Sequence, residues 1–159
     1  MRASAIVYTS RTGFTERYAR MLGEELSLPV RPLGQAPGGE TVIYLGWLRA
    51  GGVVGLRRAL RRCRVAAVCA VGMAAEVEEA KLRRDNRLEG VPLFYLRGGY
   101  APEKLTGFYR AMMAPMARLV SRAPAETEAD RAMRDAFRDG GDWVSPERLA
   151  PVLAWLDGD

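Results

Sequence analysis

The fold is decided by residues 5–15, which read Ala5-Ile6-Val7-Tyr8-Thr9-Ser10-Arg11-Thr12-Gly13-Phe14-Thr15. The first four residues are apolar and β-prone, which predicts a buried strand, and a helical pattern then runs to Leu26. A strand that leads through a loop of hydroxyl side chains and one glycine into a helix presents free backbone N–H groups and the positive helix end to an anion. The loop is therefore predicted to bind a phosphate ester.

The spacing of this loop excludes two better-known phosphate loops. It has neither the Gly-x-x-x-x-Gly-Lys-Ser/Thr pattern of nucleotide triphosphatases nor the Gly-x-Gly-x-x-Gly pattern of dinucleotide-binding proteins. Instead, Thr9-x-x-Thr12-Gly13-x-Thr15 resembles the FMN phosphate-binding loop of the flavodoxin family. The resemblance implies that backbone N–H groups and the hydroxyls of Ser10, Thr12 and Thr15 hold the phosphate of FMN. A generic loop of small polar residues is the alternative.

Composition limits the class of protein. The 159 residues suit one domain, and with 48% hydrophobic and 27% charged residues they match an ordinary soluble globule. No apolar run approaches the roughly 20 residues that cross a bilayer, and the first strand leaves no room for a signal peptide, so we expect a cytoplasmic protein. Histidine is absent, which disfavours histidine-based acid–base catalysis and metal binding and favours chemistry carried by a cofactor. Cys63 and Cys69 are expected to be reduced, buried fillers.

The chain is basic, with 24 Lys and Arg against 19 Asp and Glu and a net charge of +5. The densest group of basic residues is Arg57, Arg58, Arg61, Arg62 and Arg64. Apolar residues separate these arginines at helical spacing and no aromatic residue is placed for base stacking, so a solvated helix face is favoured over a nucleic-acid site. The charge favours acidic proteins, anionic lipid surfaces or anionic small molecules as partners.

Strands and helices alternate over the first hundred residues. Strands are predicted at residues 3–9, 28–32, 41–46, 65–71 and 91–96, and helices at 12–26, 53–62 and 74–88. Continuous apolar strands separated by helices indicate a parallel sheet covered on both faces. We therefore predict a doubly wound, flavodoxin-like α/β fold with five parallel strands in the order 2-1-3-4-5, in which ligands bind beside the end of strand one. A response regulator would need acidic residues there, where this chain has Tyr8 and Thr9.

Two further loops are predicted to hold the flavin ring. Residues 46–52 follow the third predicted strand, and Trp47 can stack on a planar ring there, in a loop that resembles the tryptophan-bearing flavin loop of flavodoxins. Packing of Trp47 against the next helix is the alternative. After the fourth strand, where flavodoxins typically have a tyrosine, Gly72 and Met73 leave only a sulfur–aromatic contact, and Tyr100 is the aromatic residue that could compensate.

The predicted FMN-binding residues come from these three loops and are Thr9, Ser10, Arg11, Thr12, Gly13, Phe14, Thr15, Gly46, Trp47, Leu48, Arg49, Gly72 and Met73. No catalytic side chain and no metal site is expected. Positive neighbours such as Arg11, Arg49 and Arg97 would stabilise an anionic reduced flavin. This predicts a flavin that is less strongly reducing than the flavin of acidic flavodoxins.

An additional helical segment is predicted after the fifth strand, over residues 102–144 of the single domain. Pro115 is expected to kink or break its first helix. Thr127 and Asp130 mark the start of a second helix, which Gly140-Gly141 ends.

Apolar residues recur at helical spacing in this segment at Phe108, Met112, Met116 and Leu119, flanked by Lys104, Arg110, Arg118 and Arg122. Two interpretations are open. The apolar face covers the sheet edge, which is favoured because a chain of this length needs that cover, or it faces a membrane or a quinone.

The likeness to known proteins extends over nearly the whole chain, 1–159. Residues 91–100, Lys104-Leu105 and residues 110–113 resemble bacterial flavodoxin-domain proteins related to the flavodoxin-type, quinone-linked protoporphyrinogen dehydrogenase. The resemblance implies an FMN-binding electron-transfer protein whose partner is a redox protein, a quinone or a small organic donor. Two alternatives are a flavin-dependent dehydrogenase of a porphyrinogen-like donor, and a binding module that kept the fold without the flavin.

Overall fold

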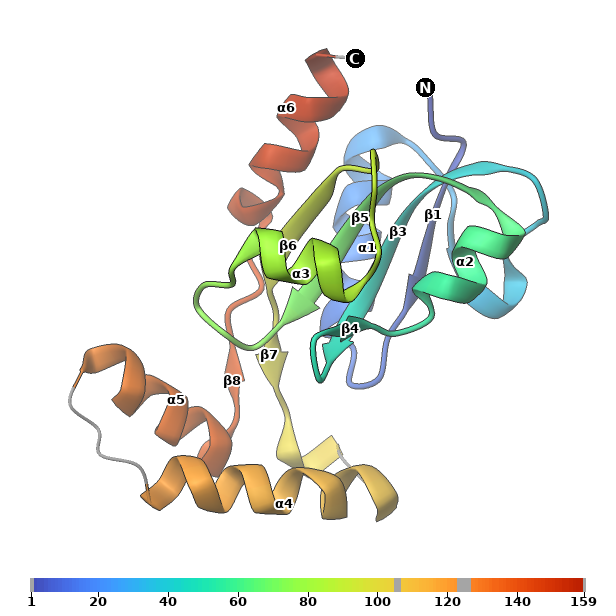
Figure 1. Cartoon of the computed structure of the whole chain (residues 1–159). Coiled ribbons are helices and arrows are strands. Elements are labelled where there is room, and N and C mark those ends of the chain that lie inside the picture. Colours follow the sequence, from blue (N-terminus) through green and yellow to red (C-terminus); the bar gives the residue numbers. More distant parts are fainter. Residues whose placement is uncertain (1, 105–106, 123–126, 159) are drawn as a thin grey trace.

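The computed structural model describes residues 2–104, 107–122 and 127–158, without the side chains of residues 109, 116, 117 and 121. Its main sheet is built from five parallel strands in the order β2-β1-β3-β5-β6 (Figure 1). Their bounds are β1 (Ala5–Thr9), β2 (Val30–Pro32), β3 (Thr41–Arg49), β5 (Arg64–Gly72) and β6 (Leu93–Arg97). The predicted doubly wound, flavodoxin-like fold class and its strand order are confirmed.

Helices cover both faces of this sheet. One face carries α1 (Phe14–Leu26) and α6 (Ala150–Gly158), and the other carries α2 (Leu56–Arg62) and α3 (Glu79–Asp85). Successive residues of β1 point to opposite faces: Val7 belongs to the core under α2 and α3, and Ile6 belongs to the core under α1. Both side chains are fully buried, which is why the strand is apolar without alternation.

The third strand continues beyond its predicted end and turns back on itself. β3 reaches Arg49 and pairs with β4 (Gly52–Val53) in an antiparallel hairpin. Ala50 and Gly51 form the turn with φ values of 49° and 81°, which matches the two positive φ angles of a tight hairpin turn. Part of the predicted ring loop is therefore strand, and α2 begins three residues later than predicted, at Leu56.

The predicted third helix is shortened at both ends and spans only Glu79–Asp85. Asn86 ends it by bonding to the β3–β4 hairpin. Its Oδ1 accepts from the Val53 amide at 2.7 Å, and its Nδ2 donates to the Gly51 carbonyl at 2.9 Å. This contact between segments more than thirty residues apart has no local sequence signal.

The segment after β6 forms a helical hairpin on a narrow stem (Figure 1). The stem pairs β7 (Gly99–Tyr100) with β8 (Gly141–Asp142), and the hairpin consists of α4 (Gly107–Arg122) and α5 (Glu128–Asp139). Short 3-10 turns complete the chain at Leu33–Gln35, Pro102–Lys104 and Pro146–Leu149. The start of α5 is as predicted, because the Thr127 hydroxyl accepts from the Asp130 amide at 3.1 Å in a capping box.

α4 differs from two expectations. It continues through Pro115 as one helix, so the predicted break is wrong. Pro115 and Ala111 are both exposed, so water can satisfy the carbonyl that proline leaves without a donor. The apolar face also does not cover the sheet edge: Phe108 and Leu119 are 71% and 72% exposed, while the side chain of Met116 lies outside the described part. α4 packs on α5 instead.

Candidate functional site

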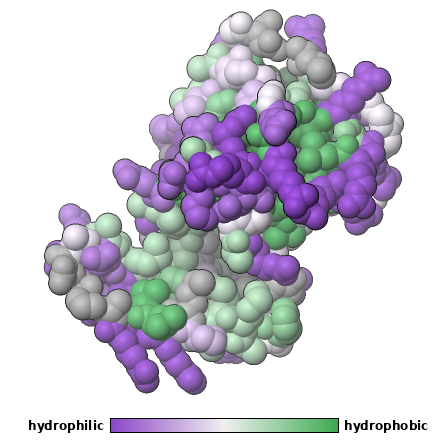
Figure 2. Space-filling view, in the orientation of Figure 1, coloured by the Kyte–Doolittle hydropathy of each residue, from purple (hydrophilic) through white to green (hydrophobic). Residues whose placement is uncertain are grey.

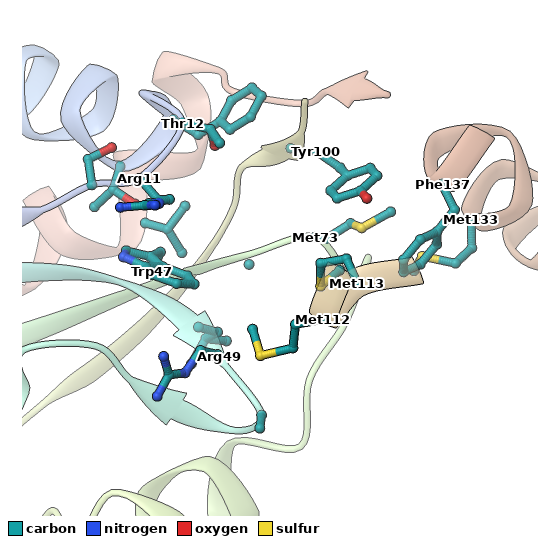
Figure 3. A pocket seen from close by; sticks show the side chains of 18 residues that line it. Arg11, Thr12, Trp47, Arg49, Met73, Tyr100, Met112, Met113, Met133 and Phe137 are labelled. Atoms are coloured by element: carbon teal, nitrogen blue, oxygen red, sulfur yellow. The ribbon is translucent and has the colours of Figure 1, made fainter. Parts of the chain in front are cut away.

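A cavity of ≈360 Å³ opens at the carboxyl ends of β1, β3 and β5, between the sheet and the α4–α5 hairpin (Figure 3). This is the place beside the first strand where doubly wound sheets bind ligands, and the volume falls in the range of about 300–1,000 Å³ for small-molecule sites. Ten of the thirteen predicted residues line it, and the three that do not are Thr9, Gly13 and Gly46.

Hydroxyl groups gather at the end of the cavity formed by the β1–α1 loop. Ser10, Thr12 and Thr15 line it, and Thr15 is only 2% exposed. The Ser10 hydroxyl accepts from the Gly13 amide at 3.2 Å, so its own proton remains able to donate to a ligand. The first N–H groups of α1 have no partner within the helix and point to the same loop. Lys104 adds a positive charge, because its ammonium donates to the Thr12 carbonyl at 3.4 Å.

Thr9 faces away from the cavity and holds the loop in place. The Tyr44 hydroxyl donates to the Val54 carbonyl at 2.6 Å, so in its 2.7 Å contact with Thr9 it must be the acceptor. The Thr9 hydroxyl therefore donates its proton to the Tyr44 hydroxyl and not to a ligand. Burial raises the pKa of Tyr44 to about 12, which keeps this chain of hydrogen bonds intact at neutral pH. The sequence cannot distinguish this threonine from the three hydroxyl residues that line the cavity.

Gly13 and Gly46 do not line the cavity, but their backbone conformation positions neighbouring residues that do. Gly13 precedes α1 with a φ of 98°, a conformation that favours glycine. At Gly46, an added Cβ would lie 2.6 Å from a methyl of Val53 and 2.8 Å from the Val54 carbonyl. Glycine at this position therefore lets β4 fold back on β3, and the hairpin in turn holds the side chains of Trp47 and Arg49 at the cavity.

The long sides of the cavity are apolar. Trp47 lies on β3 opposite Val71 of β5 and lines one side. The other side has four methionines and two aromatic rings, and Tyr100 and Phe137 lie in contact, with ring centroids 5.2 Å apart and planes inclined at 46°. The methionines are Met73, Met112, Met113 and Met133. Tyr100 thus lines the cavity from β7.

Sequence reasoning missed the contribution of the helical hairpin. Met112 and Met113 come from α4, and Met133 and Phe137 come from α5. Met133 and Phe137 are four residues apart and therefore share one face of α5. This spacing indicates an apolar face, but it does not show what that face covers. Only the return of the chain through the β7–β8 stem brings this face over the ends of the strands.

Among the described residues, the lining includes two arginines, Arg11 and Arg49, and no acidic residue. Arg97, the third predicted positive neighbour, does not line the cavity. Its guanidinium lies 3.8 Å from the ring centroid of Trp143, and its Nε donates to the Met73 carbonyl at 3.2 Å. Arg97 therefore braces the loop after β5. Both this cationic lining and the helix start favour an anionic ligand.

Comparison of the chain with protein-family models, with curated proteins and with solved structures gives no match. Within the described residues, no group of three or more His, Cys, Asp or Glu side chains is arranged to hold a metal ion, and no helix is both long and apolar enough to span a membrane. The function is therefore inferred from the cavity itself.

Proposed function

We propose that this protein binds FMN in the cavity and carries electrons. The observation that supports this most directly is the combination of three features in one site: a hydroxyl-rich helix start at one end, an indole along one side, and no carboxylate among the described residues of the lining. A flavin mononucleotide has the matching parts, namely a dianionic phosphate monoester joined to a planar ring. The mostly apolar site, with hydroxyl groups at one end, suits both.

The residues present fit this cofactor. Ser10, Thr12 and Thr15 would donate hydrogen bonds to the phosphate together with the first N–H groups of α1. Trp47 would stack on one ring face, and the soft sulfurs opposite would contact the other. The methionine and aromatic side chains of the hairpin would exclude water from the ring. When bound, the flavin would supply the redox chemistry, and the chain would bind it, orient it and set its potential.

The charges near the site support a flavin that is easily reduced. Arg11 and Arg49 line the cavity, and none of the described residues that line it is acidic. Each 1.4 kcal/mol by which they favour the anionic reduced form raises a one-electron potential by ~59 mV. A potential at or below that of acidic flavodoxins would contradict this assignment. Replacement of Arg11 and Arg49 by Gln should lower the potential, whereas replacement of the more distant Arg57 should leave it unchanged.

The proposed function is tested by the small molecule that copurifies with the protein and by titration. Mass spectrometry should identify FMN in the purified protein or, after its removal, FMN should bind and its fluorescence should be quenched. Riboflavin, which lacks the phosphate, should bind much more weakly. Equal affinity for the two would mean that the hydroxyl loop holds no phosphate, and a failure of both to bind would favour the flavin-free module.

The hairpin supports a second candidate, a flavin-dependent dehydrogenase. Met133 and Phe137 of α5 extend the cavity beyond the three predicted flavin loops, where an apolar organic donor could lie against the ring. Steady reduction of a bound flavin by such a donor, a porphyrinogen for example, followed by reoxidation with a quinone, would support this candidate. Reduction only by a redox protein would support the electron carrier.

A further inference from the structure

The helix α4 turns a strip of apolar side chains to the outside of the molecule. Phe108, Met112 and Leu119 are 71%, 38% and 72% exposed. They lie four and seven residues apart and therefore share one face of the helix. Ala111 and Pro115 between them are exposed as well. Figure 2 shows that hydrophobic surface prevails over the lobe of α4 and α5, whereas hydrophilic groups cover much of the visible face over the sheet.

Positive charges accompany this strip. α4 contains Arg110, Arg118 and Arg122, all exposed, and no acidic residue. The neighbouring helix is different, because on α5 the Arg138 guanidinium contacts Asp135 at 3.2 Å and Asp139 at 3.0 Å. The charge of α4 is thus not neutralised by acidic side chains on the helix itself.

We propose that α4 docks on an anionic lipid surface, with Phe108 and Leu119 inserted among the acyl chains and Arg118 and Arg122 at the phosphate headgroups. An amphipathic helix with large apolar side chains on one face and arginines beside them is typical of a helix that lies in the plane of a membrane interface. With 16 residues and three arginines, α4 is shorter and more charged than a membrane-spanning helix.

The shape of the strip favours a flat, fluid surface as its occupant. Phe108 and Leu119 are separated by eleven residues, which is ~16 Å along the helix axis. The strip runs along one side of a single helix that contains arginines and no acidic residue, which suits a surface that is apolar inside and anionic at its boundary, as an anionic bilayer is. A second copy of the chain is disfavoured, because a two-fold contact through this face would bring the arginines of both copies close together.

Docking by this face would also orient the cavity. Met112 belongs to the exposed strip and lines the cavity as well. A membrane that contacts the strip would therefore lie next to the methionine side of the site, from which small apolar molecules dissolved in the lipid could enter. The docking itself requires no flavin and stands independently of the proposed function.

The test is co-sedimentation of the full chain with vesicles of phosphatidylcholine alone and of phosphatidylcholine mixed with an equal part of phosphatidylglycerol. We expect binding to the mixed vesicles only, weakened by added salt. The double variant Phe108→Ser, Leu119→Ser should bind at least ~100-fold more weakly, since each large apolar side chain contributes roughly tenfold or more when fully buried. Replacement of Arg118 and Arg122 by Gln should weaken binding about fivefold per residue. Arg110 lies nine residues from Leu119 and therefore on the opposite side of the helix, so its replacement by Gln should have a smaller effect.

The matched control is Leu60→Ser. Leu60 is 41% exposed on α2, a helix with four arginines, so this variant removes an apolar side chain from another basic helix elsewhere on the surface. It should bind like the parent protein, and all variants should have unchanged far-UV circular dichroism and melting curves. Equal binding of the double variant and the parent, no binding to anionic vesicles, or a dimer in analytical ultracentrifugation that the double variant abolishes would overturn the proposal.

Discussion

Two threonines of the β1–α1 loop provide the sharpest test of how the site is built. Thr15 lines the cavity and is 2% exposed, whereas Thr9 donates to the Tyr44 hydroxyl at 2.7 Å outside it. Replacement by valine removes the hydroxyl of either residue and keeps its shape nearly unchanged. If FMN is bound as proposed, Thr15→Val removes a donor to the phosphate, and Thr9→Val removes only an internal hydrogen bond.

The expected effects differ in kind. A hydrogen bond to a charged group contributes about 1.5–3 kcal/mol, so Thr15→Val should weaken FMN binding by roughly 10- to 150-fold and leave riboflavin binding unchanged. A neutral hydrogen bond contributes about 0.5–1.5 kcal/mol, and Thr9→Val should lower the free energy of unfolding by about that amount. The preference of Thr9→Val for FMN over riboflavin should stay within about twofold of the parent value.

The assay combines two measurements on each variant. Titration of the protein into FMN and into riboflavin, followed by flavin fluorescence, gives the affinity ratio, and urea unfolding without ligand gives the free energy of unfolding. The ratio isolates the phosphate contact because the ring contacts are common to both ligands. A Thr9→Val variant that loses its preference for FMN while Thr15→Val keeps it would refute the assignment of the two hydroxyls.

Three further predictions concern the same site and its core. Gly13→Ala and Gly39→Ala should each lower the free energy of unfolding by roughly 1–2 kcal/mol, because both glycines have a positive φ and an added Cβ would meet nothing within 4 Å. Only Gly13→Ala should also weaken FMN binding in titration. Trp47→Leu should weaken FMN and riboflavin equally, by about 1–3 kcal/mol, in the same fluorescence assay, and an effect on FMN alone would contradict ring stacking. Burial raises the pKa of Cys69 to about 12, so little thiolate is present at pH 8. A chromogenic thiol reagent should therefore modify Cys69 only after the protein is unfolded in urea. Rapid modification of Cys69 in the folded protein would contradict its burial.

Local patterns were sufficient to predict the sheet and one end of the site. Ile6 and Val7 are both buried because the strand is covered on both faces, so β1 appears in the sequence as a continuous apolar run. The strand order follows from the alternation of such runs with helices, and the order places the hydroxyl loop at the ligand edge. Thr15 and Trp47 were therefore predicted near one another although they are 32 positions apart.

The topology of the sheet and the residue types in the loops at its edge could be predicted because both depend on neighbours along the chain. Long-range packing determines the rest: Thr9 bonds to Tyr44, Asn86 ends α3 on the β3–β4 hairpin, and α4 leaves Phe108 exposed while α5 closes the cavity. An amphipathic helix shows which of its faces is apolar, but what covers that face depends on where the rest of the chain brings its partners.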